Sequence, residues 1–254
     1  MKGYLGGIVL GLIQGLTEFL PVSSSGHLAL AEKVGIGEEN LFLNLTMHLA
    51  TLFSVVIVMR KPLLDVIKHP TSNRTKFLLL ASVPTAFIAG LIRYLLPDTT
   101  DFLPLFFMVT AAILLLPRII FGREPIPKAN YYDNWIKNAF IVGAAQGVAC
   151  FNGISRSGST VVAMNLTGQY GKECAENSFL LSIPIILGSA AVEFLTGGAK
   201  TVDIPMLIAA GITSFLTGIV AIKVFLKVLK NNKIQIFSIY AFVMSIASFL
   251  ILYL

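Results

Sequence analysis

Residues 11–26 read GLIQGLTEFLPVSSSG, and residues 143–158 read GAAQGVACFNGISRSG. Aligned without a gap, the two stretches share seven identities in 16 positions. In each, an apolar segment containing glycine runs into a turn rich in serine and glycine. The identities are Gly11/Gly143, Gln14/Gln146, Gly15/Gly147, Phe19/Phe151, Ser23/Ser155, Ser25/Ser157 and Gly26/Gly158. A match of this kind at one fixed shift indicates an internal duplication.

The composition around these stretches is that of a membrane protein. Hydrophobic residues make up 56% of the 254 residues and charged residues 13%, about half of the 25% typical of soluble domains. The mean hydropathy is +0.82. So few charges cannot cover the surface of a soluble protein of this size. Soluble, disordered and fibrous classes are excluded, and an all-α polytopic membrane protein is predicted.

Six apolar stretches approach the ~20 residues that cross the hydrocarbon core of a bilayer. They are residues 41–59, 77–96, 102–120, 178–197, 204–226 and 235–254. The segments 3–31 and 138–168 differ from these, because each is apolar at both ends and polar in the middle. Irregular backbone at membrane depth is tolerated only inside protein or beside a water-filled cavity. Each of the two segments therefore predicts a re-entrant helix pair.

The duplication predicts an inverted-topology repeat within a single domain, 1–254. Its two repeats, about 1–120 and 133–254, each hold one re-entrant pair and three spans. Since three is odd, the second repeat must begin on the opposite side of the membrane. In such folds the functional site lies near the midplane, where the repeats meet.

Loop charges agree with this topology. Basic residues gather in the segments 60–76, 117–137 and 223–233, whereas Glu32, Glu38, Glu39, Asp98, Asp101, Glu193 and Asp203 occupy the intervening loops. The positive-inside rule then places the three basic segments in the cytoplasm and both termini outside the plasma membrane. The same rule accounts for the net charge of +6. No nucleic-acid partner is expected, because no basic patch is interleaved with aromatic residues.

Ionisable residues at membrane depth are costly and are functional candidates by default. Glu18 lies four residues after Gln14, so both project from one helix face. Its carboxylate could hold a divalent cation or act as a general base; alternatively it caps a helix or pairs with Arg156. His27 follows three serines, Ser23 to Ser25, and is interpreted as a nucleophile or as a base that activates one; a hydrogen-bonded structural histidine is the alternative.

Arg156 stands between Ser155 and Ser157 in the second polar turn. Its guanidinium is a planar donor fork that matches phosphate, and hydroxyls with backbone N–H groups at a helix start complete an anion cradle. The alternative is a buried arginine–glutamate pair that fixes the two turns together. Residues expected to bind substrate are Ser23, Ser25, Ser155, Ser157, Gly158 and Thr160. This set suits a phosphate or pyrophosphate, and a lipid-linked one fits best because its tail can stay in the bilayer while its head enters the site.

Two motifs carry a specific resemblance. The run QGLTEFLPVSSSGHL at 14–28 is similar to the first signature of the undecaprenyl-pyrophosphate phosphatase (bacitracin-resistance) family, and GISRSGST at 153–160 resembles the second. The segments 181–184 and 237–240 also look familial, so the likeness covers nearly the whole chain. Three positions depart from the family pattern: Gln14 replaces an acid, Asn152 a proline and Ala241 an arginine.

The resemblance implies an outer-face enzyme that hydrolyses a polyprenyl diphosphate, embedded among membrane lipids, to the monophosphate carrier and inorganic phosphate. It implies that Glu18 and Gln14 help to hold a divalent cation, Mg²⁺ or Ca²⁺, and that Arg156 holds the diphosphate. Either Ser24 or His27 would be the nucleophile or base. The rival hypothesis is a flippase for the polyprenyl phosphate, because inverted repeats with broken helices are typical of transporters; a structural scaffold is a weaker one. A glycine every fourth residue, from Gly3 to Gly15, permits a homodimer or packing within one chain.

Overall fold

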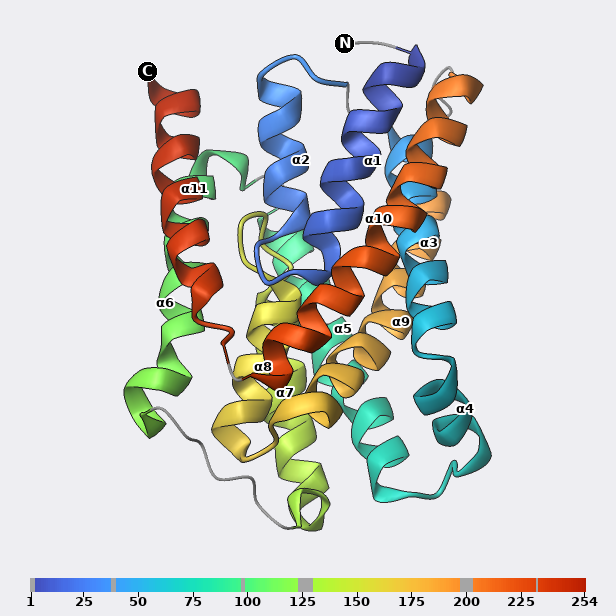
Figure 1. Ribbon diagram of the computed structural model, residues 1–254, viewed down its shortest axis with the longest axis vertical. Coiled ribbons are helices and arrows are strands. Elements are labelled where there is room, and N and C mark those ends of the chain that lie inside the picture. The colour runs from blue at the N-terminus through green and yellow to red at the C-terminus, as the bar shows by residue number, and fades with distance from the viewer. Residues whose placement is uncertain (1–2, 38–39, 97–98, 123–129, 197–202, 232) are drawn as a thin grey trace.

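The computed structural model describes residues 3–37, 40–96, 99–122, 130–196, 203–231 and 233–254 (Figure 1). All regular elements within these ranges are helical. The α-helices are α1 (Gly3–Phe19), α2 (Ser24–Lys33), α3 (Leu41–Val58), α4 (Arg60–Lys68), α5 (Asn73–Leu95), α6 (Leu103–Phe121), α7 (Trp135–Val148), α8 (Arg156–Thr167), α9 (Gly171–Thr196), α10 (Ile204–Lys230) and α11 (Ile236–Tyr253). Two short 3₁₀ helices, η1 (Thr100–Phe102) and η2 (Tyr131–Asn134), precede α6 and α7.

Six helices in the described part of the chain, α3, α5, α6, α9, α10 and α11, are long and apolar enough to cross a membrane. The six predicted spans are thus confirmed as apolar helices of spanning length. The helix α9 begins at Gly171, seven residues before the predicted span. The predicted span starts later because the first turns of α9 carry charged residues, which lower the hydropathy of that stretch. The basic segment after α3 holds a separate short helix, α4. The predicted loop acids Glu38, Glu39 and Asp98 lie outside the described residues.

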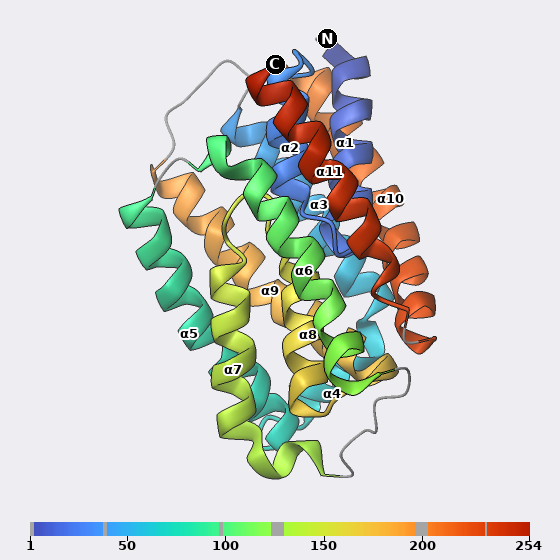
Figure 2. The ribbon, with the colours of Figure 1, turned by 90° about the vertical axis from the view of Figure 1, so that its left-hand side faces the viewer.

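Many apolar side chains point outward from these helices. On α10 alone, Ile208, Ile212, Leu216 and Val220 are exposed, and they recur at the four-residue spacing of one helix face. The helices α6 and α11 lie side by side along another edge of the molecule (Figure 2). An apolar exterior of this extent is a liability in water and is the surface that lipid requires.

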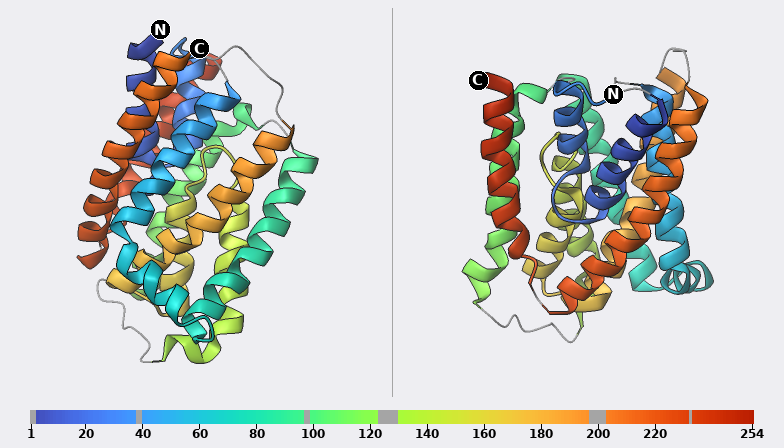
Figure 3. Two further views of the ribbon diagram at one scale, coloured as in Figure 1. Left: turned by 90° about the vertical axis from the view of Figure 1, so that its right-hand side faces the viewer. Right: turned by 45° about the horizontal axis from the view of Figure 1, so that its top comes forward.

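The charged segments separate along the long axis of the molecule. The start of α1, the end of α11 and the start of α10 lie at one end, whereas α4 and the end of α10 lie at the other (Figure 1, Figure 3). The end of α2, which carries the acidic residue Glu32, and the start of α10, which follows Asp203, lie at the first end, whereas the basic helix α4 lies at the second (Figure 1). Of the charges in 117–137, Arg123, Glu124 and Lys128 lie outside the described residues.

Apart from α4, the α-helices other than the six spans form two pairs, α1–α2 and α7–α8. Residues 20–23 join α1 to α2, and residues 149–155 join α7 to α8. The pair α1–α2 occupies one half of the molecule and the pair α7–α8 the other, so that the two polar turns meet near the middle (Figure 1). A hydrogen bond joins them directly: the backbone N–H of Gly153 donates to Ser23 Oγ at 3.0 Å.

Glycines let each helix pair lie close to a long helix. A Cβ added at Gly11 would stand 2.6 Å from the backbone oxygen of Ala210 on α10, and one at Gly147 would stand 2.7 Å from Ile88 Cβ on α5. The glycines on α1 therefore pack against α10 of the same chain. The packing covers Gly7, Gly11 and Gly15, whereas a Cβ added at Gly3 would meet nothing within 4 Å; a homodimer stays a prediction.

The end of α1 is anchored in the main apolar core. Phe19 is almost fully buried, and its ring meets that of Phe179 on α9 edge to face, with centroids 5.6 Å apart. Phe225 on α10 packs against Phe179 in turn. Because Phe19 directly follows Glu18, this aromatic cluster fixes the position of the carboxylate.

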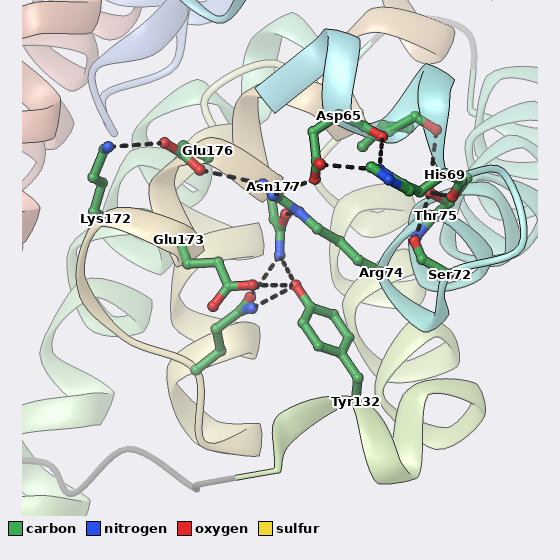
Figure 4. A network of polar contacts seen from close by, with 12 residues as sticks. Asp65, His69, Ser72, Arg74, Thr75, Tyr132, Lys172, Glu173, Glu176 and Asn177 are labelled. Atoms are coloured by element: carbon green, nitrogen blue, oxygen red, sulfur yellow. Dashed lines mark hydrogen bonds and ion pairs between the residues drawn. The ribbon is translucent and has the colours of Figure 1, made fainter. Parts of the chain in front are cut away.

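At the end of the molecule that carries α4, a network of polar contacts joins α5, η2 and the start of α9 (Figure 4). Arg74 at the start of α5 donates to Asn177 Oδ1 on α9 at 2.9 Å and pairs with Glu176. Asn177 donates to the hydroxyl of Tyr132, which donates to Glu173. Burial raises the pKa of Tyr132 above its usual value, so the hydroxyl stays protonated and able to donate. The network clamps α5, η2 and the start of α9 together.

Candidate active site

Three of the predicted catalytic residues meet around one carboxylate. Glu18 in the last turn of α1 accepts a hydrogen bond from Ser24 Oγ, the first residue of α2, at 2.5 Å. Gln14 Nε2 donates to the same oxygen, Oε2, at 3.1 Å. Arg156, the first residue of α8, forms an ion pair with the other oxygen, Oε1. The cluster therefore joins both polar turns, and the predicted pairing of Glu18 with Arg156 is present.

The burial of the pair is unequal. The Glu18 side chain is 1% exposed, whereas that of Arg156 is 23% exposed. The carboxylate is thus enclosed by its donors, while the Arg156 side chain stays partly exposed. A buried ion pair of this kind depends on both partners, because removal of one leaves an uncompensated charge at a cost of about 3–5 kcal/mol.

The side-chain oxygen of Gln14, Oε1, makes no hydrogen bond within the described part of the chain. The Gln14 side chain is fully buried. A buried acceptor without a partner costs about 1–3 kcal/mol. Beside Glu18 this oxygen is a ready ligand for a hard cation or an acceptor for a bound donor. In the described ranges no group of three or more histidine, cysteine, aspartate or glutamate side chains is placed to hold a metal ion.

In both polar turns a serine hydroxyl caps the start of the following helix. Ser23 Oγ accepts from Gly26 N, and Ser155 Oγ accepts from Gly158 N at 3.1 Å, so each serine caps the helix that follows. Ser23 adopts a left-handed backbone with φ 67°. Strained backbone of this kind persists where the surroundings fix it, commonly at functional sites. The positive ends of α2 and α8 consequently meet at the cluster and favour an anion there.

Thr110 on α6 supports the second turn, although sequence reasoning did not single it out. Its hydroxyl donates to the Gly153 carbonyl at 2.8 Å and accepts from Ser155 N at 3.0 Å. The turn is closed in this way although Asn152 stands where the family motif has proline. The one sequence signal was a hydroxyl within an apolar span, and that signal is weak because hydroxyls often bond to their own helix.

The other predicted substrate contacts are placed differently. Ser25 is exposed and lies 3.4 Å from Ser23 Oγ. Ser157 Oγ donates to the Leu20 carbonyl, and Thr160 bonds to Ser178 on α9 at 2.6 Å. The last two hydroxyls thus hold the turns and helices together, and their contact with phosphate stays a prediction.

His27 does not contact Ser24 or Glu18 through the hydrogen bonds of its ring. Nδ1 lies 2.7 Å from the Ser23 carbonyl, and Nε2 lies 2.7 Å from the hydroxyl of Tyr240 on α11. Sequence reasoning missed Tyr240 as a partner because it stands 213 positions away, within an apolar span. Of the other two histidines, His48 bonds to the Asn44 carbonyl of its own helix, and His69 is exposed beside Asp65.

These features define a class: a polytopic α-helical membrane protein whose interior brings together a carboxylate, a hydroxyl and a guanidinium. The chain matches the family model described as Bacitracin resistance protein BacA over residues 7–247, and it belongs to this family. It is 35% identical to the Undecaprenyl-diphosphatase of Christiangramia forsetii over 263 residues, which cover 97% of each chain. It is 38% identical to the Undecaprenyl-diphosphatase of Halothermothrix orenii over 250 residues, 94% of each chain. The resemblance carried by the two motifs is confirmed.

Proposed function

We propose that this protein is an integral-membrane phosphatase that hydrolyses undecaprenyl diphosphate to undecaprenyl phosphate and inorganic phosphate. The meeting of Glu18, Ser24 and Arg156 where the two polar turns touch carries this proposal. Family membership and the names of curated relatives that align over almost their whole length support it. The lipid tail stays in the bilayer, and the diphosphate enters between the turns.

Ser24 is the nucleophile that the geometry favours. Its hydroxyl already donates to Glu18 Oε2 at 2.5 Å, which is the arrangement of a nucleophile with its general base. Glu18 takes the hydroxyl proton as Ser24 Oγ bonds to the terminal phosphorus, and the bond from that phosphorus to the bridging oxygen breaks. Undecaprenyl phosphate leaves; water then attacks the phosphoserine, releasing phosphate and restoring the hydroxyl.

Arg156 and the helix starts bind the charge of the diphosphate. The partly open guanidinium can contact phosphate while its other side remains paired with Glu18. Phosphoryl transfer needs positioning and charge stabilisation more than covalent chemistry, and a planar fork beside two positive helix ends provides both.

A divalent cation fits this site as a partner of the substrate. Mg²⁺ is commonly held by one or two carboxylates with substrate phosphates completing its coordination. Gln14 Oε1, which is buried and unused, and the Glu18 carboxylate are the residues that would hold Mg²⁺ or Ca²⁺. When bound, the ion neutralises negative charge on the diphosphate. Oxygen ligands favour these ions over zinc.

In the proposed topology, the helix pairs α1–α2 and α7–α8 are re-entrant and belong to inverted repeats. Three observations support this: the meeting of the turns near the middle, the common end of the two termini, and the opposite end taken by α4 and the end of α10 (Figure 1, Figure 3). With the basic segments in the cytoplasm, the site opens to the outer face of the plasma membrane.

Phosphate release by protein purified in detergent tests the proposal. Hydrolysis needs no sealed membrane, whereas a flippase performs no chemistry on its substrate. The parent protein is expected to release phosphate from undecaprenyl diphosphate, and Ser24→Ala is expected to lose at least a hundredfold in kcat. His69→Ala, a change in the exposed loop, serves as the control and should keep parental activity. A Ser24→Ala protein as active as the parent would remove Ser24 from the mechanism.

A further inference from the structure

Both ring nitrogens of His27 have partners. Nδ1 faces the Ser23 carbonyl, which can only accept a hydrogen bond, so Nδ1 carries a proton. In the neutral imidazole Nε2 is then the acceptor, and the Tyr240 hydroxyl, 2.7 Å away, donates to it. The two contacts together select one tautomer of His27.

Two aromatic rings also fix the plane of the imidazole. The Tyr240 ring lies nearly parallel to it, at 9° with centroids 5.7 Å apart. Phe107 on α6 meets it edge-on, at 89° with centroids 5.4 Å apart. His27 therefore has little freedom to turn about its own bonds while Tyr240 and Phe107 stay in place.

The position of Tyr240 is set by helices outside the two polar turns. On the same helix, α11, Ser245 Oγ donates to the Pro104 carbonyl on α6 at 2.7 Å. This bond holds α11 against α6, the helix that carries Phe107 (Figure 2). The Tyr253 hydroxyl donates to the Asp101 carbonyl at the far end of α11, away from Tyr240. The two packed helices α6 and α11 thus supply both aromatic rings that contact the imidazole.

Tyr240 lies at the edge of the site. Its side chain is 43% exposed, whereas the Glu18 carboxylate is enclosed. His27 lies three residues after Ser24, so that both project from one side of the first turn of α2. The imidazole thus stands between the exposed rim and the start of the helix that carries the nucleophile.

We infer that Tyr240 is a positioning residue for the hydrolysis, acting through His27. Its hydroxyl and ring hold the imidazole in one tautomer and one plane, so that the unprotonated Nε2 is the nitrogen that can accept a proton, which the water that attacks the phosphoserine supplies. This inference rests on the proposed function.

Tyr240→Phe removes the hydroxyl and keeps the ring. Loss of one such hydrogen bond is expected to lower kcat about tenfold. KM should change less than twofold, because Arg156 and the helix starts still bind the substrate. Tyr240→Leu also removes the ring and should lower kcat further. Tyr253→Phe is the matched control: it removes another hydroxyl from α11 without contact to His27, and it should keep parental kcat.

A spectroscopic measurement separates this inference from the proposed function. Nitrogen NMR of protein labelled at histidine, with His27 assigned by its loss in His27→Ala, reports the state of each ring nitrogen without turnover. The parent should show a protonated Nδ1 and a hydrogen-bonded, unprotonated Nε2. The Nε2 signal should move in Tyr240→Phe and stay in Tyr253→Phe.

Full kcat in Tyr240→Phe, or an Nε2 signal that the substitution leaves in place, would overturn the inference. An equal fall in kcat and melting temperature in Tyr240→Phe and Tyr253→Phe would also overturn it, because that pattern belongs to helix packing. An inactive parent protein with the expected nitrogen signals would reject the proposed function and leave the positioning of His27 by Tyr240 standing.

Discussion

Replacement of Arg156 by lysine distinguishes a substrate-binding arginine from a structural one. The Arg156 side chain is 23% exposed and touches Glu18, whose side chain is 1% exposed. Lysine keeps the positive charge but lacks the planar fork. Loss of one contact to charge that develops in the transition state costs about 2.7–4 kcal/mol, or roughly 10²–10³ in kcat.

Stability should respond much less than activity. Arg156→Lys leaves a cation beside the buried carboxylate, so the penalty of about 3–5 kcal/mol for an abandoned buried charge does not arise. We therefore expect a melting temperature in detergent close to that of the parent. Phosphate release and thermal unfolding are to be measured on the same preparations.

Arg74→Lys is the matched control. Arg74 has a comparable exposure of 17% and also pairs with a glutamate, but it lies in the network beside α4 (Figure 4). Its guanidinium contacts Asn177, Asp65 and Glu176 through different nitrogens, and one lysine ammonium cannot make all three contacts. Its replacement should therefore lower the melting temperature and leave kcat unchanged. If Arg156→Lys behaved in the same way, with full activity in the folded protein, Arg156 would be a structural partner of Glu18 and the reasoning would be refuted.

Three further predictions concern the metal, the packing and the topology. Exhaustive EDTA treatment should abolish phosphate release and Mg²⁺ or Ca²⁺ should restore it, because Gln14 and Glu18 are hard oxygen ligands; full activity after EDTA would exclude the metal. Gly11→Ala should lower the free energy of unfolding by about 1–3 kcal/mol through overpacking. Gly90→Ala is the control and should not, because nothing lies within 4 Å of the added Cβ. Equal melting temperatures of the two variants would refute the close packing of α1 on α10. Single cysteines at Lys68 and Lys230 should react only with reagents that reach the cytoplasm, and labelling from outside would reject the proposed topology.

Hydropathy and the duplication were sufficient to predict most of the architecture. A span must be apolar over ~20 residues, so α3, α6 and α10 could be placed within a few residues of their observed ends. The shared pattern at 11–26 and 143–158 also predicted that the two polar turns are related, and the structure joins them through Ser23 and Gly153. The start of α9 was misplaced because a helix can extend beyond the apolar stretch when polar partners satisfy its first turns.

The sequence was sufficient to predict those site residues that carry a charge within a segment at membrane depth. Glu18 and Arg156 stood out because charges are rare there. Tyr240 and Thr110 did not, because a tyrosine or threonine in an apolar span is common, and its partner is set by packing between distant helices. The sequence also gave no means of deciding between Ser24 and His27, since both follow Glu18 closely. The geometry favours Ser24 because the first turn of α2 aims its hydroxyl at the carboxylate.

The central claim is that Glu18, Ser24 and Arg156 hydrolyse a lipid diphosphate. Mass spectrometry of the products that purified protein forms from undecaprenyl diphosphate in detergent, together with a phosphate assay, tests it most directly. We predict equal amounts of undecaprenyl phosphate and inorganic phosphate from the parent, and neither from a folded Ser24→Ala protein. Intact undecaprenyl diphosphate after incubation with folded parent protein and divalent cation would contradict the claim.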